Sequence, residues 1–439
     1  MTNHPVFEKK ELALSSSPYV YLPVAIPTYT VEVSHREEID GELLQRALER
    51  TLRRMPYLAD TMIEEGGKIY YAKNPLPMEA AHCGEIRPVG GEATNYHLLD
   101  LTWDGNKTRF SMYHGFCDGQ GINAFLESVL YHYYCMKDGV EYDANGIRSD
   151  KMPLDPAEEF DPCTRIYEVS PDFTMPDRRQ APSVYHLPEL APTQSNTVLE
   201  YGFRLPSAEF VAYAKANGAS PAVLLAMLMG EAVLRVHPEA DKMVQAQLPI
   251  SVRRMLGCEE TFKNCSSISA LPVGGTPLDA LPFAERAARL RALLKQQMGT
   301  ELFHAVYNYI GSVYRKRMDE ATDYREEIRK PAAFMTRSSD TFYIDYIGSL
   351  HKTAYADQIT DVRFLCKPAG GAIPHLNMIE HAGEFRITCL SCFDIAPLAD
   401  ALEQAMREHG LTVARVETQS FTLPKCEWLD SVLKGILCI

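Results

Sequence analysis

Residues 109–134 read RFSMYHGFCDGQGINAFLESVLYHYY, and this stretch changes character twice. It begins as a strand, breaks at a glycine-rich turn and continues with apolar residues at helical spacing. The break leaves His114 at the strand end, where a turn lets an imidazole enter a cleft instead of a packed face. With an ordinary pKa of about 6.5, a histidine is mostly neutral near pH 7 and can still accept a proton. Such a histidine suits the abstraction of a proton from an alcohol, an amine or a thiol. From these residues alone, a histidine with a purely structural role in the turn is the alternative.

The segment HGFCDG (114–119) resembles the H-x-x-x-D-G active-site motif of the CoA-dependent acyltransferase superfamily. That superfamily includes chloramphenicol acetyltransferase, the plant BAHD enzymes, alcohol acetyltransferases and the condensation domains of nonribosomal peptide synthetases. A second resemblance lies downstream, where QLPISVRRML (247–256) precedes ETFKNCSSISALPV (260–273). In the superfamily a strand there ends in an Asn/Asp-x-Arg element, and a later Gly-Asn or Lys-Asn enters another strand. The two matches occur in the order that the superfamily has.

The resemblance implies an α/β fold, of the two-layer α+β kind, with two chloramphenicol acetyltransferase-like subdomains. We expect them at 1–175 and 176–439, as a pseudodimer with the active-site tunnel between them. The implied activity is transfer of an acyl group from a thioester donor, acyl-CoA, to the hydroxyl or amine of a small-molecule acceptor, with His114 as the base. The thioester is a co-substrate, and neither a metal nor a permanently bound cofactor is implied.

Two alternatives to this activity stay open. The first is a condensation-type enzyme that takes its acyl group from the phosphopantetheine of an acyl carrier protein. Such peptide-forming domains usually carry a second histidine before the motif, whereas this chain has Tyr113, expected to face the core. The second alternative is a catalytically silent member that only binds, and the intact His114 and Asp118 argue against it.

The resemblance gives Asp118 a structural role. An ionised aspartate close to apolar residues needs a partner. In the superfamily the motif aspartate points away from the tunnel and pairs with an arginine of the second region. Matched residue by residue, that arginine is Arg253, and Arg254 is the second candidate. Ser251 stands where many members have Asn or Asp, which leaves the local hydrogen bonding open.

Four further residues are candidates for supporting or lining the site: Gly119, Asn264, Tyr346 and Ser349. The tetrahedral intermediate of acyl transfer needs hydrogen-bond donors for its oxyanion. The main-chain N–H of Gly119 and the hydroxyls of Tyr346 and Ser349 are the candidate donors, and Asn264 is a candidate for lining the tunnel. The segment DYIGSL (345–350) occupies the place of a superfamily strand near the tunnel, although it departs from the BAHD motif D-F-G-W-G.

Other chemistry fits these residues less well. A metal site built on His114 and Asp118 lacks a third ligand at the usual spacing. Cys389 and Cys392 form a C-x-x-C, but they lie in the strand pattern FRITCLSCF, where side chains three apart face opposite ways. Cys117 receives no role, because superfamily members vary at that position.

Composition narrows the class of protein. The 439 residues carry a formal net charge of −14 without a basic run, which argues against nucleic-acid binding. Eleven scattered cysteines without a framework spacing indicate reduced thiols and a cytoplasmic protein. The first 17 residues are too polar for a signal peptide. The longest apolar run, 222–229, falls well short of the ~20 residues of a membrane span, so none is expected.

Periodicity along the chain predicts helices and several mixed or antiparallel strands in each half. Helices are expected at 40–54, 221–237, 282–298, 301–318 and 396–409. Strands are expected at 27–33, 58–63, 68–71, 97–103, 108–113, 243–250, 267–273, 341–347, 362–366, 375–380 and 384–391. The polar, proline-rich residues 137–200 are expected to connect the two halves over the surface.

Overall fold

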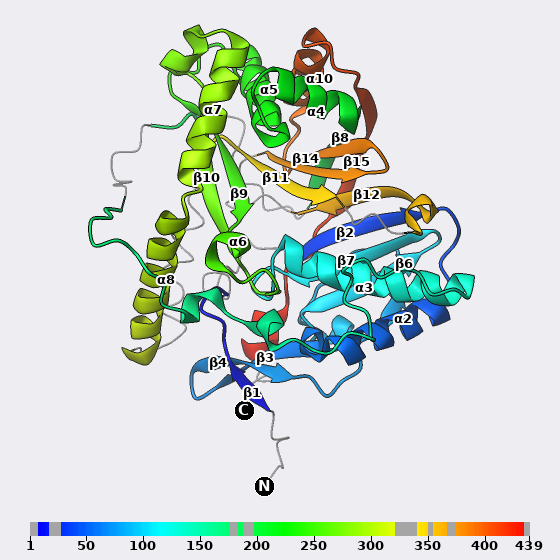
Figure 1. Cartoon of the computed structure of the whole chain (residues 1–439). Helices are drawn as coiled ribbons and strands as arrows, with labels where there is room; N and C mark the ends of the chain where they lie inside the picture. Colours follow the sequence, from blue (N-terminus) through cyan, green and yellow to red (C-terminus); the bar gives the residue numbers. More distant parts are fainter. Residues whose placement is uncertain are drawn as a thin grey trace.

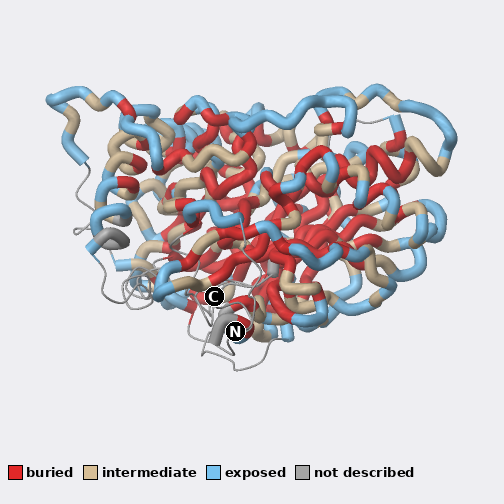
Figure 2. Tube along the Cα trace, turned by 90° about the horizontal axis from the view of Figure 1, so that it is seen from below, coloured by how far each residue is buried: buried red, intermediate tan, exposed pale blue. Residues whose placement is uncertain are grey.

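The three-dimensional structure is a computed structural model, which describes residues 8–16, 28–175, 183–187, 197–320, 340–349, 354–366 and 374–433. These residues form a mixed α/β arrangement with sheets of three, five and seven strands. The two larger sheets lie beside each other, and each has its own set of helices (Figure 1). Buried residues run through the centre of the molecule, and exposed residues follow its periphery (Figure 2). The α/β class is therefore the one that the sequence predicts.

The five-stranded sheet carries the motif stretch. Its strands, in spatial order, are β12 (Ile359–Leu365), β2 (Thr28–His35), β7 (Lys107–Tyr113), β6 (Leu99–Asp104) and β5 (Ala80–His82). Helices α2 (Gly41–Arg54) and α3 (Gly119–Asp138) pack together against this sheet (Figure 1). Asp40 caps the start of α2, because its Oδ1 accepts from the N–H of Leu43 at 3.0 Å. Gly105, with a φ of 54°, turns the β6–β7 hairpin.

The seven-stranded sheet forms the core of the second half. Its strands, in spatial order, are β10 (Ser266–Gly274), β9 (Val244–Ser251), β11 (Phe342–Ser349), β13 (His375–His381), β14 (Glu384–Ser391), β8 (Thr197–Pro206) and β15 (Ala414–Thr422). The helices that share its hydrophobic core are α4 (Ser207–Ala216), α5 (Pro221–Val236), α7 (Phe283–Gln297) and α10 (Ala396–Glu408). Helix α5 starts where its sequence predicts, since Ser220 accepts from the N–H of Val223 at 3.4 Å and Pro221 fills the first position.

Strands β9 and β11 are parallel neighbours that separate soon after they pair. The register joins Phe342 to Ala246 and Tyr343 to Gln247, and the pairing ends there. Pro249, two residues beyond Gln247, has no N–H with which to continue a ladder. The later residues of the two strands are therefore free to diverge.

The remaining elements surround these two sheets. They are the small sheet of β1 (Lys9–Glu11), β4 (Lys68–Lys73) and β3 (Asp60–Glu65), and the helices α6 (Arg253–Leu256), α8 (Thr300–Glu320) and α11 (Trp428–Leu433). Trp428 joins the end of the chain to the small sheet, because its Nε1 donates to the carbonyl of Met62 at 2.7 Å. Between α3 and β8 the described residues include the 3₁₀ helices η3 (Pro156–Glu159) and η4 (Pro162–Thr164), within the connection that the sequence predicts.

A strand from the second half of the chain belongs to the sheet of the first half. Strand β12 pairs antiparallel with β2 and forms an edge of the five-stranded sheet. At this join Arg363 donates to Glu32 at 3.1 Å and to Glu200 at 2.6 Å, and Arg386 donates to Glu200 at 2.8 Å. All four side chains are buried, so each charge has a partner in place of water. The boundary at residue 175 stays a prediction, but the two halves share a strand and a buried ion network.

Among the described residues, no single helix has both the length and the apolar character needed to cross a bilayer. Helices α4 and α5 meet that test only when they are joined, and they are bent by 84° at their break.

Candidate active site

The turn between β7 and α3 carries His114 and Asp118. Strand β7 ends at Tyr113, whose side chain is buried, as the sequence predicts. Asp118 is the N-cap of α3, and its Oδ1 accepts from the N–H groups of Gln120 and Gly121 at 3.1 and 3.2 Å. These are two of the N–H groups that the start of a helix leaves without a partner inside the helix. Asp118 therefore fixes the end of the turn that presents His114.

The His114 ring is held in one tautomer. Its Nδ1 lies 3.1 Å from the carbonyl oxygen of Cys117. A carbonyl oxygen only accepts, so Nδ1 carries the proton and Nε2 carries the lone pair. Burial lowers the pKa of His114 below its ordinary value, which keeps the ring neutral at pH 7. A neutral imidazole with a defined basic nitrogen is the form that a general base requires.

Two neighbours fix the position of His114. The ring of Tyr29 packs edge-on against the imidazole, with a centroid distance of 4.5 Å. Asn264 is buried, and its Nδ2 donates to the main-chain carbonyl of His114 at 2.8 Å. Its Oδ1 is buried without a hydrogen-bond partner in the described part of the chain. Asn264 thus contacts the backbone of the motif and is not among the residues that line the pocket described below.

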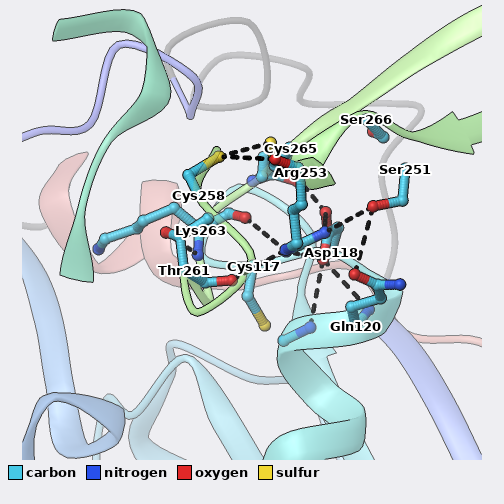
Figure 3. Close-up of polar contacts among 12 residues, drawn as sticks. Cys117, Asp118, Gln120, Ser251, Arg253, Cys258, Thr261, Lys263, Cys265 and Ser266 are labelled. Atoms are coloured by element: carbon cyan, nitrogen blue, oxygen red, sulfur yellow. Dashed lines mark hydrogen bonds and ion pairs between the residues drawn. The ribbon is translucent and has the colours of Figure 1, made fainter. Parts of the chain in front are cut away.

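Asp118 and Arg253 form a buried ion pair (Figure 3). Arg253 donates from Nη1 to Oδ2 at 2.8 Å and from Nη2 to Oδ1 at 2.7 Å, a fork of two charge-assisted hydrogen bonds. Nε also donates to the main-chain carbonyl of Thr261 at 2.9 Å and Nη2 to that of Lys263 at 2.8 Å. Nη1 donates to the hydroxyl of Ser251 at 3.4 Å. Arg254, the second candidate partner, is exposed.

The same carboxylate also holds the loop that follows α6. Oδ2 of Asp118 accepts from the main-chain N–H of Cys265 at 2.9 Å. Asp118 therefore receives hydrogen bonds from α3, from Arg253 and from the loop, which accounts for the burial of a charged residue that is 5% exposed. Lys263 extends away from the ion pair (Figure 3), and its Nζ lies 3.7 Å from the ring centroid of Tyr71.

A pocket of about 150 Å³ opens beside this turn. Its described lining consists of Tyr29, His114, Asp118, Gly119, Gln120, Pro249, Ile250, Ser251, Arg253, Ser266, Asp345, Tyr346, Ile347 and Phe364. Residues 249–251 of β9 and 345–347 of β11 lie just beyond the point where these strands stop pairing. The pocket is therefore built where two parallel strands diverge next to the motif turn.

Some of the remaining candidate residues line this pocket and others do not. Gly119 and Tyr346 line the pocket, and Tyr346 is 43% exposed. Ser349 ends β11 and is not part of the described lining. Cys117 is buried, and burial raises the pKa of its thiol, which agrees with giving it no role. Cys389 is also buried, and burial raises its pKa to about 12.

A group of three residues beside the pocket was not predicted from the sequence. His375 Nε2 donates to Asp345 Oδ2 at 2.6 Å, and His375 Nδ1 lies 3.2 Å from Cys366 Sγ. Their ligand atoms lie within 4.8 Å of one another, close enough for a metal ion. However, the contact between Asp345 and His375 is a hydrogen bond that uses the nitrogen a metal between them would need. The one signal in the sequence was a lone aspartate within the apolar strand TFYIDYI (341–347).

Comparisons with known proteins bear on the fold. No protein-family model matches the sequence, and no curated protein matches it. Solved structures match over nearly the whole chain. The chain is similar to TRI101 from F. graminearum, solved with coenzyme A and T-2 mycotoxin, with a TM-score of 0.61 at 12% identity over 93% of this chain and 100% of that one.

Two other solved structures have a similar likeness to this chain. Polyketide synthase associated protein 5 from Mycobacterium tuberculosis has a TM-score of 0.57 at 14% identity, over 90% of this chain and 96% of that one. The epimerization domain from the third module of tyrocidine synthetase B has a TM-score of 0.56 at 14% identity, over 92% and 95%. At these identities the likeness concerns the fold alone. The chain has the two-subdomain fold of the CoA-dependent acyltransferases, the chloramphenicol acetyltransferase-like fold.

Proposed function

We propose that the protein is an acyltransferase that moves an acyl group from acyl-CoA to a hydroxyl or amine acceptor, with His114 as general base. The observation that carries this proposal is the 3.1 Å contact between His114 Nδ1 and the carbonyl of Cys117. It leaves Nε2 as the basic nitrogen of a residue that lines a pocket. The fold supports the same reaction, because TRI101 proteins with this fold were solved with coenzyme A.

The proposed reaction needs one proton carrier. Nε2 of His114 takes the acceptor's proton as the acceptor oxygen or nitrogen attacks the thioester carbonyl carbon. The carbon–sulfur bond then breaks, and the thiolate takes the acceptor's former proton from His114. A positioned base of this kind contributes about 10²–10⁴-fold to the rate. Holding both substrates in one pocket lowers the barrier further.

Two pocket residues are proposed to stabilise the oxyanion of the tetrahedral intermediate. They are the main-chain N–H of Gly119 and the hydroxyl of Tyr346, since both residues line the pocket. Asp118, Arg253 and Asn264 are proposed as positioning residues. Their hydrogen bonds are directed at one another and at the backbone of the motif turn.

A carrier protein is the second candidate donor. The epimerization domain and the nonribosomal peptide synthetase FmoA3 are among the matching structures, which favours an acyl-phosphopantetheine as the alternative thioester. Both donors release a thiol, so the same thiol-release assay can be run with each donor and the two rates compared.

The test is thiol release from acyl-CoA thioesters of increasing chain length, offered with a panel of alcohols and amines. The His114→Ala variant is the control, and mass spectrometry identifies the acylated product. Acyl-loaded carrier proteins form a second donor series. Release that depends on both acceptor and His114 supports the proposal, and release with the carrier-protein series alone selects the second donor. Release no faster than with His114→Ala for every donor would overturn both.

We also propose that the protein works in a reducing compartment, the cytoplasm. The cysteines that the structure describes are all free, and Cys258 and Cys265 are unbonded with their sulfurs 3.5 Å apart.

A further inference from the structure

Asp345 brings a second carboxylate to the pocket of His114. It lies on β11 and lines the pocket, and its side chain is 14% exposed. Oδ2 accepts from His375 Nε2 at 2.6 Å. Within the described residues, no hydrogen bond involves the other oxygen, Oδ1. One oxygen of Asp345 is therefore bonded to His375, and Oδ1 is the candidate acceptor for a molecule in the pocket.

His375 holds Asp345 in place from behind. His375 is 4% exposed, and its Nδ1 lies 3.2 Å from Cys366 Sγ. Burial alone lowers the pKa of His375, but Cys366 and Asp345 raise it, to about 10. The imidazole thus keeps the proton that it donates to Asp345 at neutral pH. A carboxylate fixed by a buried partner recognises a ligand with little loss of side-chain freedom.

The rest of the described lining offers no cation to an anionic ligand. Arg253 is the described lining residue with a permanent positive charge, and it donates to acceptors within the protein, namely Asp118, Ser251, Thr261 and Lys263. His114 is neutral at pH 7, because burial lowers its pKa. A carboxylate or phosphate of an acceptor near His114 would meet Oδ1 of Asp345, because the counter-charge of Asp345, the imidazolium of His375, is bonded to the other oxygen, Oδ2. A positively charged group would be attracted to Asp345 instead.

We propose that Asp345 selects the acceptor of acyl transfer, and that this acceptor is an amine whose N–H groups donate to Oδ1 of Asp345. The proposal rests on the acyltransferase function, because it names the acceptor class of that reaction. A carboxylate discriminates an ammonium group from a neutral hydroxyl, since only the ammonium gains from the opposite charge.

An amine acceptor adds one proton transfer to the reaction, and His114 is the residue in the pocket that can accept this proton. A primary alkylamine has an ordinary pKa of about 10.4, so it enters the pocket protonated and must lose a proton before it attacks. Asp345 binds the ammonium, and Nε2 of His114 takes one of its protons. The neutral nitrogen attacks the thioester carbonyl carbon, the carbon–sulfur bond breaks, and the thiolate takes the proton from His114. The new amide nitrogen releases its extra proton to solvent, so the products are an amide, a thiol and one proton.

The experiment compares a primary amine with the alcohol of the same carbon skeleton. Thiol release is measured for wild type, Asp345→Asn and Asp345→Glu, with the acyl-CoA that wild type uses best. Asp345→Asn should lower kcat/KM for the amine about 10–100-fold, chiefly through KM, as expected for the loss of a charge-assisted hydrogen bond. The alcohol should change less than about threefold. Asp345→Glu keeps the charge and should retain the preference for the amine.

Two controls keep the outcome interpretable. Asp357→Asn makes the same change at an exposed position outside the pocket and should match wild type. Melting temperatures of the Asp345 variants show whether each is folded. Equal losses for amine and alcohol, or a wild type that accepts alcohols and no amines, would overturn the amine assignment while acyl transfer stands.

A binding measurement separates this proposal from the proposed function. The amine is titrated without donor, and the shift in melting temperature is recorded for wild type and Asp345→Asn. If wild type releases no thiol with any donor, the acyltransferase proposal fails, and the shift in melting temperature alone shows whether Asp345 binds an amine. A shift in wild type that Asp345→Asn abolishes supports the Asp345 site. An equal shift in both, or none in wild type, overturns it.

Discussion

The carboxylate of Asp118 and the guanidinium of Arg253 are 135 residues apart in the sequence, and they meet with an Nη2–Oδ1 distance of 2.7 Å. The same Oδ1 accepts from the N–H of Gly121 at the start of α3. One side chain therefore joins the helix that follows the motif to the loop after α6. That loop in turn holds the carbonyl of His114 through Asn264. The ion pair accordingly controls where His114 lies without needing to touch the reacting atoms.

Breaking this pair from one side should cost stability and activity together. Asp118→Ala and Arg253→Ala each leave a buried charge without its partner, which costs about 3–5 kcal/mol of the free energy of unfolding. The double variant should lose less than the sum of the two, because both single changes remove one interaction. Urea unfolding and thiol release on the four proteins measure this. An Asp118→Ala protein with unchanged stability and lost turnover would instead make Asp118 a catalytic residue.

Replacing His114 should remove activity and leave the fold intact. His114→Ala should lower kcat/KM about 10²-fold or more, since a positioned base is lost. The free energy of unfolding should fall by about 1 kcal/mol, the size of one hydrogen bond to the Cys117 carbonyl. His186→Ala changes an exposed histidine and serves as the matched control. Turnover near that of wild type in His114→Ala would contradict the general-base assignment.

Activity should fall only at a pH below the ordinary range of histidine. Burial lowers the pKa of His114, so the neutral, active form persists to a lower pH than in a free histidine. With an alcohol acceptor, which does not titrate here, kcat/KM should be flat near pH 7. It should drop about tenfold per unit below an apparent pKa that lies under about 6.5. An apparent pKa above that value would show that His114 is not held in its neutral form.

Two neighbouring glycines should respond differently to alanine. A Cβ at Gly121 would lie 2.4 Å from the carbonyl oxygen of Phe262 and 2.6 Å from Cβ of Cys117. Gly121→Ala should therefore push α3 away from the loop and cost about 1–3 kcal/mol of unfolding free energy. A Cβ at Gly119 meets no atom within 4 Å, so Gly119→Ala should keep wild-type stability. Chemical denaturation of the two variants tests the difference, and equal losses would contradict it.

Acid should destabilise the fold through His35. Burial, followed by the charge of Lys137, lowers the pKa of His35 to about 3. Below about pH 6.5 the unfolded chain binds a proton there that the native state does not, so stability falls as the pH falls toward 3. The slope for one such group is about 1.4 kcal/mol per pH unit. His35→Gln should flatten the stability curve between these limits, and an unchanged slope would exclude His35 as the cause.

Local signals predicted the parts of the site that one segment builds. The strand, turn and helix around His114 follow from periodicity and glycine placement, and Asp118 caps α3 as a side chain of its kind does. Arg253 could be named as the partner of Asp118 only through the resemblance to the superfamily. No local rule links two side chains from distant parts of a chain, and here Arg253 lies on α6 while Asp118 lies at the start of α3.

The features that sequence reasoning missed depend on strand pairing. Asp345 and His375 meet because β11 and β13 are parallel neighbours, a pairing that no sequence pattern reports. Asn264 stays a candidate for lining the tunnel, and the contact of its amide with the His114 carbonyl could not be read from the sequence. Side-chain direction depends on the path of the loop, and that path is fixed by the Asp118–Arg253 pair.

The position of β12 limits how this protein can be recombined. A chimera that takes its first half from this chain and its second half from a relative would pair β2 with a foreign edge strand. Glu32 would then lose its ion pair with Arg363 and keep the one with Arg109. Residues 359–365 must therefore come from the same parent protein as the first half in a functional chimera, although they lie far from it in the sequence. A functional exchange between relatives therefore requires two separate segments of the gene to be replaced together.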